Sequence, residues 1–212
     1  AWVNGNMVTI DGEEICTTDE LRLLGKHNWQ NVCAAATATW HALNPASPAQ
    51  VRAAVAAIRS VATSFTGLPN RLELVREREN VRYYNDSFAS TPDAALAALE
   101  AIASKKVLVM GGLDRGLPLD HVPKTFLEYA DDLRIVLLIG ASAQRLYTVC
   151  AEAGFTNCRI VDAKNMSEIV SAIQDTVQPG DAVVFSPGFA SFDMFKNFEE
   201  RGNLFRDTVN AL

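Results

Sequence analysis

The feature that most constrains the fold of this chain is a repeat of apolar strand, turn and helix that begins after Asn85. Short apolar runs alternate there with segments of helical period, and glycines stop several of the runs. The predicted strands are Lys106–Met110, Arg134–Ile139, Cys158–Val161 and Ala182–Phe185. Strands that alternate with helices need crossover connections, which favour a mostly parallel sheet with helices on both faces. We therefore predict an α/β, doubly wound fold, although the pattern leaves the order of the strands open.

The preceding part of the chain has a different organisation. Turn signals between Trp2 and Cys16 predict short antiparallel strands, and an Ala-rich helix then runs to Leu43. A second helix opens at Ser47-Pro48, before Gly67 and Pro69 interrupt the pattern. We place a domain boundary there, between residues 1–66 and 67–212. A hairpin from Arg71 to Asn85 then leads into the sheet.

Composition and charge limit the classes of function. The formal net charge of −6, with no basic cluster, argues against nucleic acid or an anionic membrane as a partner. No apolar run approaches the length of a membrane-spanning helix, and the four cysteines are scattered without metal-type spacing. These features favour a protein of the reducing cytoplasm. The chain starts at Ala1-Trp2 without an initiator Met, so we expect it to be part of a longer protein.

The stretch Ser186–Gly202 is the strongest candidate for a functional motif. It follows the buried strand Ala182–Phe185, and Ser191 is placed to cap a helix. The carboxyl ends of parallel strands are where open α/β sheets bind ligands, and free helix N-termini favour anions. An alternative is that Phe192, Phe195 and Phe198, spaced by threes, are an ordinary core face of that helix.

Other post-strand loops should converge on the same edge of the sheet. They carry Asp86-Ser87 with Ser90, Gly112 with Asp114-Arg115, and Ser186–Ser191. A carboxylate, a guanidinium and several hydroxyls would suit an anionic small molecule. The same residues are also common as turn formers and surface ion pairs. No P-loop, no Gly-x-Gly-x-x-Gly after the first strand of the α/β part and no metal-ligand cluster occurs in the sequence.

Taken in order, these motifs resemble the Mur ligases, the ATP-dependent amino-acid-adding enzymes of peptidoglycan precursor synthesis. The matching stretches are Gly25-Lys26-His27-Asn28 through Asn31, Gly67-Leu68-Pro69 with Arg71-Leu72-Glu73, Tyr84-Asn85-Asp86-Ser87, Gly111-Gly112 with Asp114, and Ser186-Pro187 through Gly202. The last stretch is the most specific of them, and the likeness covers essentially the whole chain.

The resemblance implies a domain organisation. The family has a UDP-binding domain, a central ATPase domain and a Rossmann-like C-terminal domain. By resemblance, residues 1–66 are the tail of a truncated central domain and residues 67–212 are the complete C-terminal, amino-acid-binding domain. The P-loop would then lie upstream, so the chain alone is expected to be inactive.

The resemblance also implies substrates and a mechanism. They are those of the family branch that adds D-glutamate to UDP-N-acetylmuramoyl-L-alanine through an acyl phosphate. The cofactors would be ATP and Mg²⁺, bound mainly upstream, and the protein is expected to be a monomer. A related ligase of the folylpolyglutamate synthase type and a non-catalytic nucleotide- or amino-acid-binding module are the alternatives.

Site residues follow from the same resemblance, position by position. Those implied to bind ATP are Asn28 and Asn31 beside the adenine, Asn70 near it, Arg71 at the phosphates and Asp86 at the ribose. Those implied to form the glutamate pocket are Ser90, Arg115, Ser191, Phe192 and Phe198. Catalytic roles are implied for Arg71 and Arg115. The family more often has His at position 70 and Lys at positions 88 and 115, where this chain has Asn70, Phe88 and Arg115.

Overall fold

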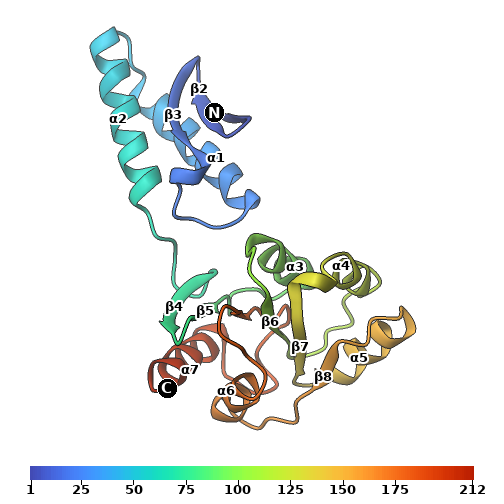
Figure 1. Ribbon diagram of the computed structural model, residues 1–212. Coiled ribbons are helices and arrows are strands. Elements are labelled where there is room, and N and C mark those ends of the chain that lie inside the picture. The colour runs from blue at the N-terminus through green and yellow to red at the C-terminus, as the bar shows by residue number, and fades with distance from the viewer. The chain divides into compact units, whose positions relative to one another are not determined.

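The structure is a computed structural model that describes residues 1–212, and these divide into two compact units, Ala1–Gly67 and Leu68–Leu212. Figure 1 labels most helices and strands of each unit. Every predicted strand and helix between Trp2 and Leu212 has a counterpart in the structure; most ends differ by a few residues, and the last helix begins later than predicted. No helix combines the length and the apolar character that crossing a membrane requires.

The first unit packs two helices beside a small antiparallel sheet. Its strands are β1 (Trp2–Asn4), β2 (Met7–Ile10) and β3 (Glu13–Thr17), in that order, and its helices are α1 (Lys26–Leu43) and α2 (Pro48–Ser64), with the short 3₁₀ helix η1 (Thr18–Glu20) between β3 and α1. Ser47 caps α2 by accepting a hydrogen bond from the backbone N–H of Gln50, as the Ser-Pro signal predicts. The core joins apolar side chains of β2, β3 and both helices, including Val8, Ile15, Trp40 and Ile58.

The second unit is a doubly wound α/β sheet. Its elements in chain order are β4 (Glu73–Arg78), β5 (Val81–Asn85), α3 (Pro92–Ala101), β6 (Lys106–Gly111), α4 (Val122–Glu128), η2 (Ala130–Asp132), β7 (Leu133–Ile139), α5 (Ala143–Glu152), β8 (Cys158–Ile160), α6 (Met166–Gln174), β9 (Ala182–Phe185) and α7 (Phe198–Asn210). The sheet order is β4-β5-β9-β6-β7-β8. All neighbouring pairs are parallel except the hairpin β4–β5.

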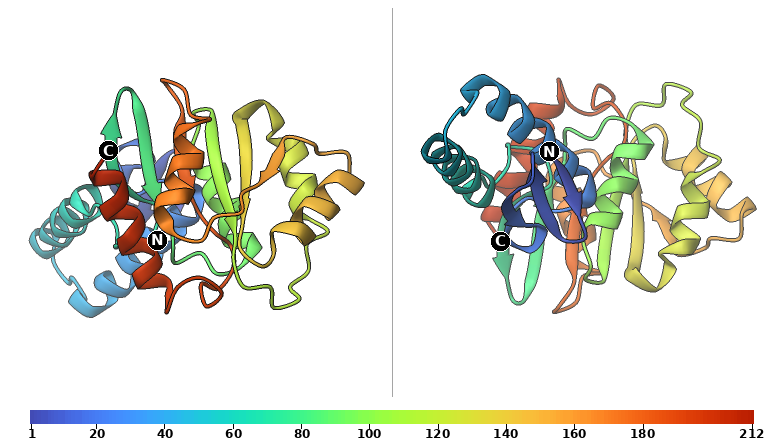
Figure 2. Two further views of the ribbon diagram at one scale, coloured as in Figure 1. Left: turned by 90° about the horizontal axis from the view of Figure 1, so that it is seen from below. Right: turned by 90° about the horizontal axis from the view of Figure 1, so that it is seen from above.

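Helices cover both faces of this sheet, which is why its central strands are largely apolar. Apolar side chains of α3, α4 and α5 pack on one face, and those of α6 and α7 pack on the other. The two views of Figure 2 show α6 and α7 in front of the sheet and then α3 and α4 in front of it. In β6, β7 and β9, residues such as Leu108, Val136 and Val184 have no exposed surface.

The position of β9 decides where the loops meet. This last strand inserts between β5 and β6, so the connection from β5 through α3 to β6 passes over it. The carboxyl ends of β5, β9 and β6 therefore lie side by side, which is the arrangement in which open α/β sheets place their ligands.

One prediction about this region is wrong. Ser191 does not cap the helix after β9, because α7 begins seven residues later, at Phe198, with Asn197 as its cap. The Asn197 side chain accepts a hydrogen bond of 2.7 Å from the backbone N–H of Glu200. Ser191 instead opens a separate turn, in which the N–H of Phe195 donates to its carbonyl at 2.8 Å. Phe195 packs partly buried against the cluster beneath α6 and α7 and is a core residue.

Candidate active site

Direct hydrogen bonds join the loops that follow β5, β6 and β9. Ser186 Oγ donates to Asp86 Oδ2 at 2.6 Å, which links the end of β9 to the end of β5. The backbone N–H of Leu113 donates to the carbonyl of Ala190 at 2.9 Å, and Arg115 Nη2 donates to the carbonyl of Ser90 at 2.9 Å. The loops predicted to converge therefore do meet at one edge of the sheet.

Two glycines make this close approach possible. Gly111 and Gly112 have φ angles of +131° and +153°, which L side chains rarely adopt. A Cβ at Gly111 would overlap the carbonyl oxygen of Ile139, and a Cβ at Gly112 would lie 2.5 Å from the carbonyl oxygen of Ala190. The Gly-Gly pair, weak evidence as a motif, is thus a packing requirement between the loops after β6, β7 and β9.

A buried cation lies beneath the loops. Arg201, in the first turns of α7, has 1% of its surface exposed. Its Nε donates to Ser87 Oγ at 2.9 Å, its Nη2 to the carbonyl of Ser87 at 2.7 Å, and its Nη1 to the carbonyl of Phe189 at 3.0 Å. Burial lowers the pKa of the guanidinium to about 10, and Asp193 and Asp86 oppose that shift. Arg201 therefore joins α7 to the loops after β5 and β9.

Sequence reasoning did not single out Arg201. It lies three residues after Phe198 and four before Phe205, so helical spacing puts it on the core-facing side of α7. The available signal was a basic residue on a predicted core face. A charge is buried only when it has hydrogen-bond partners, so such a residue indicates that buried acceptors surround it. Those partners, two carbonyls and a hydroxyl, come from loops far away in the sequence.

Asp86 is tied into the same network by both carboxylate oxygens. Its Oδ2 accepts from Ser186, and its Oδ1 accepts from the backbone N–H of Leu72 at 3.0 Å. Burial raises the pKa of Asp86 to about 6, although these hydrogen bonds and the charges of Arg71 and Arg201 favour the ionised form. The carboxylate predicted to bind a ribose thus also fixes the loop that carries Arg71.

Arg71 projects from an unusual turn. Asn70 and Leu72, on either side of it, have φ angles of +63° and +43°, in the left-handed region. Asn70 is buried, and its Oδ1 accepts a hydrogen bond of 2.9 Å from Asn85 Nδ2. The side chain of Asn70, predicted to lie near the adenine, is therefore engaged with β5 in this structure, and its contact with a nucleotide stays a prediction.

The guanidinium of Arg71 stacks on an aromatic ring. Its Cζ lies 3.8 Å from the centroid of Phe88, and Phe88 meets Phe198 edge to face at 5.0 Å between centroids. Neither a side-chain hydrogen bond nor an ion pair involves the Arg71 guanidinium, and the residue is exposed. Its N–H groups are therefore free to bind an anion.

The residues predicted to bind glutamate lie at this edge but differ in exposure. Arg115 and Ser90 are exposed, and Phe192 is 68% exposed, whereas Ser191 is buried. Phe198 lies against Phe88. No carboxylate pairs with Arg115, in contrast to the neighbouring Arg145, whose Nη1 donates to Asp114 at 2.8 Å. Their roles toward glutamate stay predictions.

The first unit holds the other predicted nucleotide contacts, Asn28 and Asn31. They lie in the first turns of α1, where Asn31 Nδ2 donates to Asn28 Oδ1 at 3.0 Å and Asn28 Nδ2 donates to the carbonyl of Leu24 at 2.7 Å. The two amides thus share one helix face, as their spacing predicts. Their contact with adenine stays a prediction.

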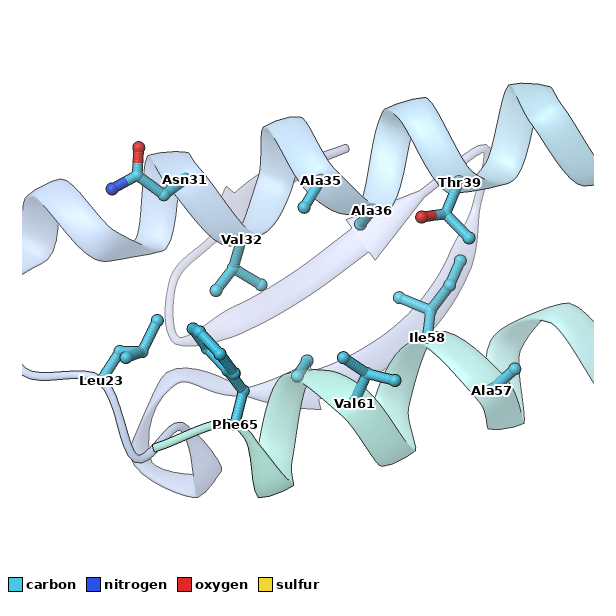
Figure 3. A pocket seen from close by; sticks show the side chains of 11 residues that line it. Leu23, Asn31, Val32, Ala35, Ala36, Thr39, Ala57, Ile58, Val61 and Phe65 are labelled. Carbon is cyan, nitrogen blue, oxygen red and sulfur yellow. The ribbon is translucent and has the colours of Figure 1, made fainter. Parts of the chain in front are cut away.

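A groove of about 380 Å³ runs between α1 and α2 in this first unit. Figure 3 shows the side chains that line it from both helices. Apart from Asn31 and Thr39 its lining is apolar, and it includes Leu23, Val61 and Phe65. No charged group lies on its walls, in contrast to the loop edge of the second unit, which carries Asp86, Arg71 and Arg115.

No group of three or more His, Cys, Asp and Glu side chains in residues 1–212 could hold a metal ion. The four cysteines are free thiols; Cys16, Cys33 and Cys150 are buried, whereas Cys158, which its apolar context also predicts to be a core residue, is only partly buried.

Comparison with known proteins agrees with this geometry. Residues 70–189 match the family described as "Mur ligase, glutamate ligase domain". The chain is 39% identical to a UDP-N-acetylmuramoylalanine--D-glutamate ligase of Symbiobacterium thermophilum, over all of this chain and 43% of the relative. It is 35% identical to the enzyme of that name from Clostridium kluyveri, over all of this chain and 44% of the relative.

Among solved structures, a UDP-N-acetylmuramoylalanyl-D-glutamyl-2,6-diaminopimelate--D-alanyl-D-alanyl ligase from Acinetobacter baumannii is similar in fold. Its TM-score is 0.58 at 19% identity, over 90% of this chain and 38% of that one. The chain therefore spans less than half the length of these relatives. The match of its second unit to the family, with loops that meet as the motifs require, shows that the chain belongs to the Mur ligase family.

Proposed function

We propose that this chain is part of an ATP-dependent ligase that joins D-glutamate to UDP-N-acetylmuramoyl-L-alanine. The relatives named for this reaction match the chain over its whole length, although the chain spans only 43–44% of theirs. Residues 67–212 would be the amino-acid-binding domain, and residues 1–66 the tail of the domain that binds ATP. The proposed enzyme acts on small molecules in the cytoplasm as a monomer, and the net charge of −6 supports the absence of a nucleic-acid partner.

The observation that carries this proposal is a set of cations at the loop edge that form no hydrogen bond or ion pair with a carboxylate. Arg71 and Arg115 are exposed there, and Arg201 is buried beneath them with only neutral acceptors. A site with this charge favours anions, and ATP and glutamate are both anionic. In the proposal Arg71 binds the nucleotide phosphates, and Arg115 binds a carboxylate of glutamate.

The remaining predicted residues complete the two parts of the site. Asn28, Asn31, Asn70 and Asp86 would contact the nucleoside. The side chains proposed around glutamate, besides Arg115, are Ser90, Ser191, Phe192 and Phe198. Phe192 and Phe198 would enclose the methylene groups of glutamate, and the carbonyl of Ser90 orients Arg115.

The reaction has two steps. The carboxylate of the UDP-linked precursor attacks the γ-phosphorus of ATP, which forms an acyl phosphate and releases ADP. The neutral amine of glutamate then attacks the acyl carbon, phosphate leaves with the electron pair of the C–O bond, and the amine loses a proton. Arg71 and Arg115 would align the reactants and stabilise negative charge. Mg²⁺ would neutralise phosphate charge when bound.

The test measures the KM for glutamate and the KM for ATP in the complete enzyme. Arg115→Ala should raise the KM for glutamate by about tenfold or more and change the KM for ATP little, because a charge-assisted contact to a carboxylate is lost. Arg159→Ala, an exposed arginine on β8, is the matched control and should change neither value. An effect of Arg115→Ala confined to ATP would mean that the amino-acid pocket lies elsewhere.

A further inference from the structure

We infer that Phe88 is a positioning residue that holds the Arg71 guanidinium in its anion-binding orientation. This inference rests on the proposed role of Arg71 at the nucleotide phosphates and names the group that fixes it. Phe88 was not among the predicted site residues.

The backbone already fixes the position from which Arg71 projects. The loop after β5 holds its neighbours: the N–H of Phe88 donates to the carbonyl of Asn70 at 3.0 Å, and Asp86 Oδ1 accepts from the N–H of Leu72. Asn70 and Leu72 both have left-handed φ angles, which cost energy for such residues and persist only where neighbouring contacts impose them. The turn therefore directs Arg71 outward from a rigid base.

The side chain of Arg71 beyond that base is long, and the aromatic ring is what restrains it. Its guanidinium lies 3.8 Å from the centroid of Phe88, and the structure contains neither a hydrogen bond nor an ion pair to this group. Phe88 is itself braced by the edge of Phe198, at 5.0 Å and 85° between the rings. Phe198 on α7 thus contacts Phe88, and Phe88 in turn contacts Arg71.

Stacking on an aromatic ring suits this positioning role because the ring contacts the flat face of the guanidinium. The N–H groups of arginine lie in its plane, so a guanidinium can rest on a ring and still donate to phosphate oxygens. A carboxylate partner would instead occupy those donors and cancel the charge. Holding the group in one orientation before binding also reduces the entropy that binding must remove.

The test is a double-mutant cycle in the complete enzyme, with Phe88→Leu, Arg71→Ala and both together. Phe88→Leu keeps apolar contact with Phe198 but removes the ring face, so it should raise the KM for ATP about threefold to fivefold. Phe88→Trp should restore the wild-type value, because Trp offers a better face. Arg71→Ala should raise the same KM tenfold or more, and Phe88→Leu should add nothing in that background.

A matched control variant and thermal unfolding distinguish a loss of Arg71 positioning from a loss of the folded state. Phe88 and Tyr147, on α5, are each 41% exposed, so Tyr147→Leu is a matched control and should leave the KM for ATP unchanged. Thermal unfolding of Phe88→Leu should stay near that of Tyr147→Leu.

Other outcomes would overturn a specific claim. If Arg71→Ala raises the KM and Phe88→Leu does not, this inference is wrong while the proposed function stands. If Phe88→Leu has its full effect without Arg71, Phe88 acts by another route and the inference is again wrong. If Arg71→Ala leaves the KM for ATP unchanged, the proposed role of Arg71 itself fails.

Discussion

The two units of the chain differ in how completely they cover their apolar surfaces. In Leu68–Leu212, helices pack on both faces of the sheet, and the strands β6 and β9 are fully buried. In Ala1–Gly67, the facing sides of α1 and α2 leave an apolar groove of about 380 Å³, and Val61 on its wall is 65% exposed. The groove of the first unit is therefore an apolar surface only, whereas the loop edge of the second unit carries both buried and exposed charged side chains.

The largest effect should come from the backbone contact between the ends of β6 and β7 in the second unit. Gly111→Ala should destabilise the chain by about 5 kcal/mol or more, because its Cβ would overlap the carbonyl of Ile139, a backbone atom that cannot turn aside. Gly116→Ala is the control: its φ is also positive, at +72°, but nothing lies within 4 Å of a Cβ there. Urea denaturation measures both, and equal losses would show that this contact does not matter.

The buried cation comes next. Arg201→Met should lower the free energy of unfolding by about 4 kcal/mol, because it leaves the carbonyls of Ser87 and Phe189 without a buried partner. Arg159→Met, at an exposed arginine, should cost less than about 0.5 kcal/mol. Denaturant titration followed by circular dichroism gives both values. A loss at Arg201 no larger than at Arg159 would contradict its role in joining α7 to the loops.

Asp86 should make the second unit sensitive to pH. Its pKa is raised to about 6 in the folded state, against about 3.9 for an unfolded Asp, so the folded state favours the protonated form. The contribution of Asp86 to the free energy of unfolding is fully present below pH 4. It is lost as the pH rises through 6, and the total loss is about 2–3 kcal/mol.

Asp86→Asn cannot titrate and should remove this loss. The difference in unfolding free energy between Asp86→Asn and the wild type should therefore grow from pH 4 to pH 7 in favour of the variant. Urea titrations at half-unit intervals of pH give the curve. A difference that stays flat or changes in the opposite direction would show that burial does not control this carboxyl group.

The smallest effect should be at the groove of the first unit. Val61→Ser should change the free energy of unfolding by less than about 0.5 kcal/mol, because the side chain is already exposed. Val109→Ser on β6, at a position with no exposed surface, should cost several kcal/mol. Thermal unfolding of the two variants compares them directly. If Val61→Ser lowers the free energy of unfolding strongly in a longer protein that contains this chain, but not in this chain alone, the groove is covered in the longer protein.

The predictable part of the site followed from local patterns. Strand ends can be read from apolar runs that stop at Gly or Pro, and parallel topology brings such ends to one edge. The convergence of Asp86, Ser90, Arg115 and the stretch after Ser186 was therefore predictable without knowledge of the strand order. The start of α7 was not, because Asp193 bonds to the backbone N–H of Ala141 and Asn197 takes the capping role.

The sequence by itself determined the α/β class, the approximate ranges of most elements and the polar groups that the post-strand loops carry. These depend on hydrophobic period and turn chemistry, which act over a few residues. Only the tertiary structure decided that β9 lies between β5 and β6, that Arg201 is buried under the loops, and that Arg71 rests on Phe88. Each of these joins residues distant in sequence or depends on side-chain direction, and no periodic pattern along the chain records such contacts.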